Sequence, residues 1–455
     1  MTGTDRRGWR DAAERLARER RWADLWNLVR QRVPLVEADR VLPLFDGRWR
    51  PDGPERPLFD LLAATPAGTV EEAYATLTAD PLLEIPVDGW IVTGSLSPDG
   101  RWLAVCVKGW TSAHRHGVQV FDLHDGRQVA RRTGDACSGA MLNTGTSVFS
   151  MDWIPPTPFL GLVRNDAADR TMLQPEEFSL IAALTWLDRD RFAVLARHYP
   201  RLGRDLEPAD CHLTYYTGEG ERVEQVVMEE DLVWGERGPD ILPSHLAADP
   251  SSGLLAVDGR TLRIVRPPYQ VLARSPEQEH HRELCFLSPD RLAAAGDGCL
   301  EIWQATGATL ERVRGVGLRP RRRGHRPILV PQRHEIMILD GIPGSGTGGE
   351  VRYLDAETLG DVEGPRELSG SIGVGLWSTP DGSRHALATE SAVHVVRDPA
   401  AGALATLAER PSSALRTVGL PLLDSVRPAT EPVRHLLALL RAATPLASRD
   451  RFPGR

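Results

Sequence analysis

The chain has 455 residues, of which 41% are hydrophobic and 25% charged, so it can bury a large core and is not disordered as a whole. Its formal net charge of −8 argues against a dedicated duplex DNA binder, which carries a basic domain. The 42 Gly and 35 Pro are too few for a low-complexity chain and too many for a mostly helical one, which favours many short strands joined by turns.

The remaining composition points to a protein of a reducing compartment. The five cysteines are widely spaced and form no C-x-x-C pair, so we expect neither a disulfide framework nor a zinc site. The first residues are charged and lack the apolar segment of a signal peptide, and no apolar run approaches the ~20 residues of a spanning helix. We expect a cytoplasmic protein that does not enter a membrane. Lys108 is the only lysine; the other basic residues are arginines, which a GC-rich genome explains best.

Residues 1–87 are predicted to form an α-helical domain. Apolar residues recur at helical spacing in two segments, and Pro34 ends the second: Trp9, Ala12, Ala13, Leu16 and Ala17, then Trp22, Leu25, Trp26, Leu28 and Val29. Two further short helices are expected at 58–64 and 70–77, the second opened by Thr69 and Glu72 as a capping box.

Residues 88–420 contain an internal repeat. An apolar strand, a Pro/Asp/Gly turn and a second apolar strand recur at 95–107, 185–196, 246–258, 286–296, 329–339 and 377–389. A second strand–turn–strand segment follows at 117–131, 211–225, 260–274, 298–313, 349–363 and 391–407. The six steps from Pro98 to Pro380 average about 47 residues, with one weak repeat at 151–163 around Pro155 and Pro156. Four strands per unit at this spacing predict a mainly β fold, a seven-bladed β-propeller, with six or eight blades as alternatives.

Residues 421–455 are predicted to form an amphipathic helix and a tail. The helix begins after Thr430, and its apolar stripe comprises Val433, Leu436, Leu437 and Leu440. Such a stripe must be covered, and we expect the N-terminal helices to cover it, because closing the ring brings the two ends of the propeller together.

The repeat resembles that of the WD40-like β-propellers over about residues 90–410. The resemblance lies in the Ser-x-x-Pro-Asp-Gly type of turn before a strand, as at 95–100, and in later strands that end in an aromatic residue, as at 120–122, 301–303 and 352–355. The Gly-His and Trp-Asp pairs of the strict family are absent from most units, so the chain resembles a divergent, bacterial-type member. The resemblance implies a rigid interaction platform and transfers no catalytic residue.

One arginine-rich segment is the most concentrated charge feature of the chain. Residues 319–327 read RPRRRGHRP, and the candidate partner-binding residues here are Arg319, Arg321, Arg322, Arg323 and Arg326. They suit an acidic partner or a nucleic-acid backbone, but the acidic balance of the chain makes nucleic acid the weaker choice. The alternative without a binding role is a solvated arginine-rich loop.

Two further features have both a functional and a purely structural interpretation. Trp22 and Trp26 share a helix face, where they either pack in the core or serve as aromatic anchors for a partner. The glycine-rich segment 341–350 lacks the Lys-Ser/Thr of a phosphate loop, so we expect a loop between two strands of one blade.

Histidines cluster at 114–116 and 280–281, where Glu283 and Cys285 are near, but no second spaced ligand set accompanies them. We therefore expect no metal and no cofactor. No common catalytic motif is present, and we name no catalytic residue. The sequence favours a non-catalytic protein-interaction scaffold or adaptor, a subunit of a bacterial multiprotein system with protein partners of unknown identity. The alternative is an enzyme or small-ligand binder, of hydrolase or lyase type, with its site at the mouth of the propeller channel.

Overall fold

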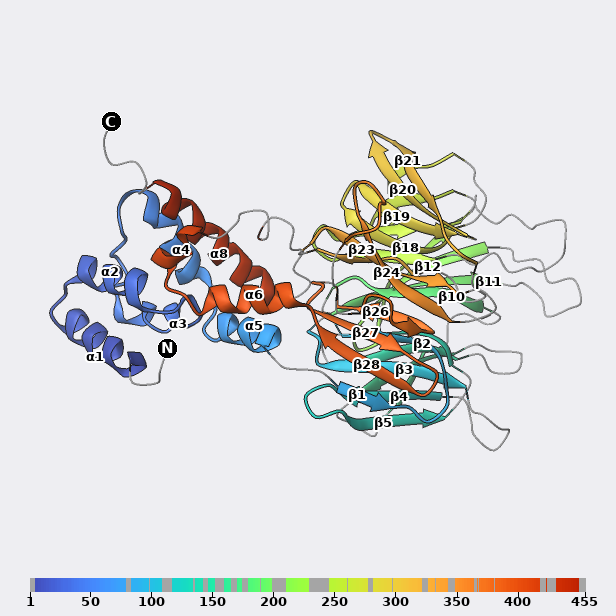
Figure 1. Cartoon of the computed structure of the whole chain (residues 1–455), viewed down its shortest axis with the longest axis horizontal. Helices are drawn as coiled ribbons and strands as arrows, with labels where there is room; N and C mark the ends of the chain where they lie inside the picture. The colour runs from blue at the N-terminus through green and yellow to red at the C-terminus, as the bar shows by residue number, and fades with distance from the viewer. Residues whose placement is uncertain are drawn as a thin grey trace, which may run out of the picture. The chain divides into compact units, whose positions relative to one another are not determined.

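The architecture is described from a computed structural model of the chain (Figure 1). The described residues are 5–78, 83–97, 99–108, 117–133, 136–141, 146–151, 159–164, 170–173, 179–188, 190–198, 210–228, 245–259, 261–276, 281–296, 298–320, 326–331, 333–342, 348–363, 366, 368–379, 381–417, 423 and 431–449. The chain divides into two compact units: Met1–Asp80 together with Asp398–Arg455, and Pro81–Arg397. The second unit is therefore inserted into the sequence of the first.

The first unit is helical and draws on both ends of the chain. Its elements are α1 (Asp5–Arg18), α2 (Trp22–Arg32), α3 (Leu35–Ala38), η1 (Leu42–Leu44), η2 (Gly53–Glu55), α4 (Arg56–Ala64), α5 (Thr69–Thr78), α6 (Pro399–Ala408), η3 (Ser412–Thr417) and α8 (Glu431–Arg449). Helix α2 ends before Val33 and Pro34, as proline requires. No helix in the described part of the chain is long and apolar enough to cross a membrane.

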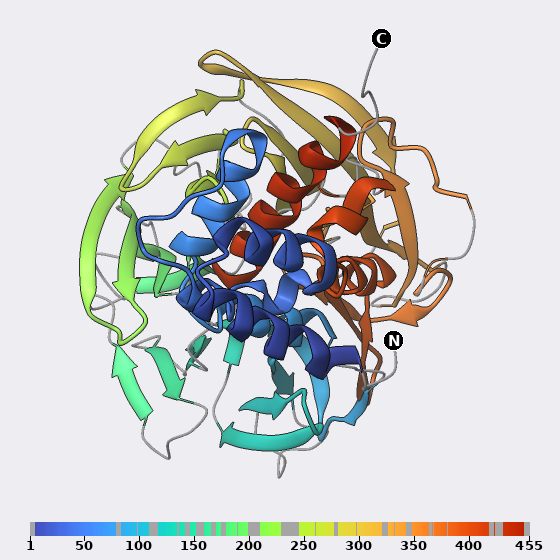
Figure 2. The same cartoon turned by 90° about the vertical axis from the view of Figure 1, so that its left-hand side faces the viewer.

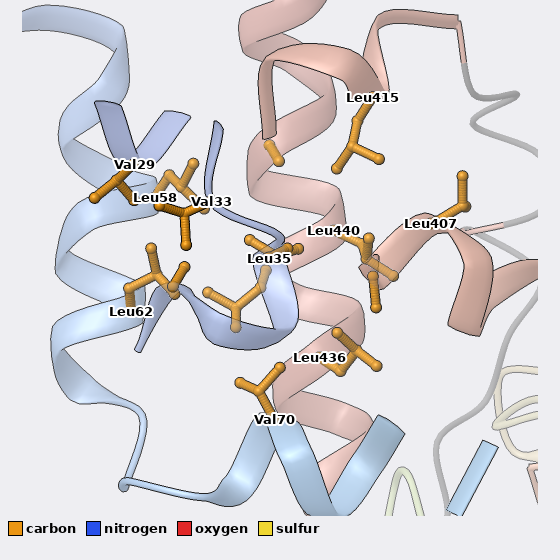
Figure 3. Close-up of a cluster of buried hydrophobic side chains, with 14 of the residues drawn as sticks. Val29, Val33, Leu35, Leu58, Leu62, Val70, Leu407, Leu415, Leu436 and Leu440 are labelled. Carbon is orange, nitrogen blue, oxygen red and sulfur yellow. The ribbon is translucent and has the colours of Figure 1, made fainter. Parts of the chain in front are cut away.

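One hydrophobic core joins the two chain segments of the helical unit. Val433, Leu436, Leu437 and Leu440 of α8 are at most 1% exposed and share a cluster with Leu25 and other residues of the N-terminal helices. Figure 3 shows Leu436 and Leu440 close to Leu35 and Val70. The expectation that the C-terminal stripe docks on the N-terminal helices is confirmed.

The second unit is made of β-strands. They are β1 (Leu83–Pro86), β2 (Trp90–Leu96), β3 (Trp102–Lys108), β4 (Gly117–Asp122), β5 (Arg127–Thr133), β6 (Ala136–Met141), β7 (Thr146–Met151), β8 (Phe159–Arg164), β9 (Arg170–Leu173), β10 (Ser179–Trp186), β11 (Arg191–His198), β12 (Asp210–Thr217), β13 (Arg222–Met228) and β14 (Leu246–Asp249). They continue as β15 (Leu254–Val257), β16 (Arg263–Arg266), β17 (Gln270–Arg274), β18 (His281–Ser288), β19 (Arg291–Gly296), β20 (Cys299–Thr306), β21 (Thr309–Gly317), β22 (Ile328–Val330), β23 (Glu335–Gly341), β24 (Gly349–Asp355), β25 (Ile372–Gly373), β26 (Gly375–Ser378), β27 (Arg384–Ala388) and β28 (Ala392–Arg397).

The strand order is that of a β-propeller. Among the described residues, five sheets have four strands each, and one eight-stranded sheet consists of two further four-stranded meanders, β14–β17 and β18–β21, joined by one bridge between Arg274 and Thr309. Figure 2 shows the strands placed around a ring, with the colour passing from teal through green and yellow to orange. The predicted mainly β propeller is confirmed, and its seven groups of four agree with the preferred blade number.

The last group closes the ring because it contains the first strand. Strand β1 pairs with β28, so that Leu83 lies opposite Val395 and Pro86 opposite Ala392. A core cluster joins this group to the first one: Val393 and Trp377 pack with Ile91 and Leu103. Other clusters similarly join successive groups, so apolar sheet faces are buried against each other rather than exposed to water.

The outermost strand of four groups carries one extra residue in its pairing with its neighbour. The residues are Val129, Val223, Leu272 and Val313, each left over where the register shifts. Such a bulge twists an exposed edge strand and hinders edge-to-edge pairing with other chains.

The expected domain boundaries require correction. The propeller begins before residue 88, because β1 at Leu83–Pro86 is one of its strands. It ends at Arg397 rather than at residue 420, and residues 421–455 form no separate part because α8 completes the helical unit. The sequence conceals β1, since four residues ending in proline carry no strand pattern of their own.

Two predicted hairpins are also wrong in their second strand. Residues 399–408, read as part of a strand, form α6, where Pro399 occupies the first turn and the alanines that follow favour a helix. The strand expected near residue 361 is reduced to one bridge between Leu354 and Asp361, and the fourth strand of that group is Ile372–Gly373.

Candidate functional site

The two candidate anchor tryptophans belong to the core of the helical unit. Trp26 is 2% exposed, its Nε1 donates to Glu55 Oε2 at 2.8 Å, and its ring meets Phe59 edge to face at 5.2 Å. Trp22 is half-buried against the same core, 6.3 Å from the ring of Phe45. A buried indole cannot reach a partner, so the anchor interpretation is wrong for Trp26, and the contacts of Trp22 match core packing.

The arginine-rich segment lies between β21 and β22, and the structure describes its two ends. Arg319 comes two residues after the end of β21, and Arg326, which is exposed, comes two residues before the start of β22. The candidate residues Arg321, Arg322 and Arg323 lie outside the described residues.

Arg319 is held by two carboxylates. Its backbone N–H donates to Asp340 Oδ1 at 2.7 Å, and its Nε donates to Asp340 Oδ2 at 3.0 Å. Its Nη2 donates to Glu350 Oε2 at 3.3 Å, while the side chain remains 44% exposed. Because both backbone and side chain are bound, the start of the arginine-rich segment has a defined position on strands β23 and β24.

Asp340 is the centre of this arrangement. It is 2% exposed and also accepts a hydrogen bond from Arg352 Nη1 at 2.8 Å, while Arg352 pairs in addition with Asp361. Burial by itself raises the pKa of Asp340, but the hydrogen bonds from Arg319 and Arg352 outweigh it and lower that pKa below its ordinary value. A buried carboxylate shared by two arginines is thus kept ionised and positions both guanidinium groups.

Gly341 brings the glycine-rich segment against the arginine-rich one. A Cβ on Gly341 would lie 2.3 Å from the carbonyl oxygen of Pro320 and 2.6 Å from that of Arg319, so only glycine fits. The Gly341 N–H donates to the Arg319 carbonyl at 3.3 Å. The segment 341–350 joins β23 to β24 within one sheet, as expected, and the two unusual loops of the sequence therefore start side by side.

The predicted histidine clusters give no described metal site. His114, His116 and His280 lie outside the described residues, and His281 is described only as part of β18. Glu283 of that strand lies 4.0 Å from Nδ1 of His245, which precedes β14. Within the part of the chain that the structure describes, no three His, Cys, Asp or Glu side chains form a group that could hold a metal ion.

The sequence does not point to Asp340 and Glu350, the acidic partners of Arg319, or to Arg352. Asp340 ends the apolar run of β23 and Arg352 lies two residues after Glu350, but neither position carries a motif. Because side chains alternate between the two faces of a strand, Glu350 and Arg352 lie on the same face of β24. This spacing is the signal in the sequence that could have identified them as neighbours. The pairing with Arg319 depends on how two successive sheets come together.

The chain was compared with known families, curated proteins and solved structures. No family model matches it, and no curated protein matches it. Among solved structures, a chain of the mitotic checkpoint complex is 14% identical, with 70% of this chain and 92% of that chain covered at a TM-score of 0.48. The WD40 domain of Neurospora crassa Pan2 is 9% identical, with 68% and 89% covered at a TM-score of 0.45. The WD40 repeats of RRP9 are 10% identical, with 70% and 98% covered at a TM-score of 0.46. The strand order of this chain itself establishes the propeller fold.

Proposed function

We propose that this chain is a non-catalytic protein-interaction scaffold or adaptor that works in the cytoplasm as a subunit of a bacterial multiprotein system. The observation that supports this most is the site at Asp340, where one buried carboxylate holds the beginning of the arginine-rich segment next to Gly341, the first residue of the glycine-rich segment. Loops on a rigid scaffold are where binding surfaces are built, and a closed ring supplies such a scaffold.

The electrostatic design fits binding rather than chemistry. Around Asp340, Arg319 and Arg352 form ion pairs with the carboxylates of Asp340, Glu350 and Asp361. Arginines fixed in this way suit the recognition of carboxylates in a fixed orientation, because the guanidinium group is planar and always charged. The reduced conformational freedom of a paired arginine lowers the entropy lost when a partner binds.

The test is purification of the tagged protein from its native host after chemical cross-linking, with quantification by mass spectrometry. We expect at least one protein at a constant molar ratio, cross-linked to the propeller, and less of it with Arg319→Ala. Arg222→Ala, on the exposed outer strand β13, is the matched control and retains the partner. The proposal is refuted if the tagged protein retains no other protein at a constant molar ratio at any ionic strength tested.

The channel alternative has one observation in its favour. His245 and Glu283 belong to two successive strand groups and contact each other at 4.0 Å near the starts of β14 and β18, strands that are themselves in contact. A thermal-shift screen with metabolites distinguishes the two functions. A ligand that stabilises the wild type but not His245→Ala supports a small-molecule site; shifts that are equal in both proteins exclude one at this pair.

A further inference from the structure

A strip of exposed arginines follows the junction between two blades, the group β18–β21 and the group β22–β25. Arg314 of β21 is the Cα partner of Ile302, so the two side chains share a face of that sheet. Ile302 is fully buried against Leu329 and Ile336 of the next group. Arg314 therefore projects toward the side on which β22–β24 lie, and it is exposed because it is on the outermost strand.

Arg319 and Arg326 continue the strip along the same junction. Arg319 is fixed to Asp340 on β23, two residues after β21 ends. Arg326 comes two residues before Ile328, and Ile328 lies opposite Met337 of β23. Because β22 and β23 are antiparallel, the step back from Ile328 to Arg326 leads toward the end of β23, where Asp340 binds Arg319. Three arginines separated along the chain are thus gathered by the pairing of β21 with β20 and of β22 with β23.

The strip has an excess of positive charge although the protein is acidic. Asp340 is buried and pairs with both Arg319 and Arg352, Glu350 pairs with Arg319, and Asp361 pairs with Arg352, so the excess positive charge is that of Arg314 and Arg326. Within the described part of the chain, neither Arg314 nor Arg326 pairs with a carboxylate. On a chain of net charge −8, one local positive strip attracts an anionic partner to a single place and orients it.

We propose that this strip, formed by Arg314, Arg319 and Arg326, binds an acidic segment of a partner protein, one that presents several Asp or Glu side chains in extended chain. This inference rests on the proposed scaffold function and names the chemistry of the partner. A single-stranded nucleic acid fits less well, because such sites combine basic residues with exposed aromatic side chains on which bases stack. Among the described residues, the large exposed hydrophobic side chains include one aromatic, Trp90, and it belongs to β2, a strand of another blade.

The probe is a fluorescent peptide of about twelve residues composed of Glu, Asp and Gly, whose binding to the full-length protein is followed by anisotropy. A peptide with Gln and Asn in place of the acids is the uncharged control, and a twelve-nucleotide thymidine oligomer represents nucleic acid. We expect the acidic peptide to bind and the uncharged peptide not to bind, with an affinity that falls as salt rises.

The decisive comparison is between two double charge reversals with the same net charge. Arg314→Glu with Arg326→Glu should weaken binding of the acidic peptide about tenfold or more, since each reversal replaces an attraction by a repulsion. Arg127→Glu with Arg222→Glu, on the exposed outer strands β5 and β13, should weaken it less than about twofold. Circular dichroism and thermal unfolding of both variants verify that the propeller is intact.

Two results overturn the inference. Equal loss of binding in the two double variants shows that net charge alone acts, and tighter binding of the oligonucleotide through Arg314 and Arg326 assigns the strip to nucleic acid. Neither result decides the scaffold function. If the host complex persists while the acidic peptide fails to bind, the scaffold stands and the partner class is wrong; if no host complex exists, the scaffold itself fails.

Discussion

The guanidinium of Arg384, on strand β27 of the last blade, donates a hydrogen bond to the backbone carbonyl of Gly100, in the first turn of the first blade. The Arg384 side chain is buried, which lowers its pKa, while the nearby Asp381 and Asp99 act in the opposite direction. This contact adds a side-chain link to the pairing of β1 with β28 at the place where the ring closes.

Replacing Arg384 by methionine should therefore destabilise the protein by about 2–4 kcal/mol, because a buried carbonyl loses its donor and two aspartates lose a cation. Urea unfolding followed by tryptophan fluorescence measures the change. Arg101→Met is the control: Arg101 also pairs with a carboxylate, Asp122, but its side chain is 59% exposed, so the loss should stay below about 1 kcal/mol. Equal losses would show that Arg384 has no special role in closure.

Gly341→Ala should disturb the site without removing any charged group. The new Cβ would meet backbone oxygens at 2.3 and 2.6 Å, and backbone atoms cannot rotate away as a flexible side chain can. We expect a loss of stability of about 1–3 kcal/mol and weaker binding of the acidic peptide. Gly317→Ala is the matched control, since nothing lies within 4 Å of its added Cβ. An alanine at 341 that binds and unfolds like the wild type contradicts the proposed contact between the two loops.

Glu357 should make the propeller sensitive to acid. Its carboxylate accepts hydrogen bonds from Arg291 at 2.5 Å, in the preceding blade, and from His334 at 3.0 Å, and these lower its pKa from 4.5 to about 2. A carboxyl whose pKa is depressed on folding stabilises the protein above its unfolded pKa, and this contribution is lost as pH falls from about 5 to 2. The stability gap between wild type and Glu357→Gln, from urea midpoints, should be full above pH 5 and vanish near pH 2. A gap that is constant over this range would show that the ion pair does not contribute.

Leu437→Ala should destabilise the helical unit by about 2–5 kcal/mol, because Leu437 is 1% exposed in a core shared with the N-terminal helices. Hydrogen exchange should quicken at α4 and α5, which precede the propeller in sequence, and remain unchanged in β10–β24. Arg434→Ala, on the exposed face of the same helix, should leave exchange as in the wild type. Faster exchange confined to α8 would contradict a core common to both chain ends.

Much of the fold follows from local patterns in the sequence. The apolar runs and turn residues of each repeat determine the hairpins, as at β2–β3 with Gly100 and at β20–β21 with Gly307, because glycine readily adopts the positive φ that both turns require. The stripe of α8 likewise shows that the helix must be covered. Local patterns do not show the structure of an element without a strong pattern of its own, and therefore only the tertiary structure shows that 83–86 form a strand and 399–408 a helix.

The site itself depended on tertiary structure. The charge of residues 319–327 is visible in the sequence, but the carboxylates that hold Arg319 belong to another sheet strand and carry no motif of their own. That Gly341 touches Pro320, and that Arg314 joins the same strip, follows from strand register across two blades. A one-residue shift in that register would turn these side chains to the other face, and register between blades is decided by packing of the whole ring.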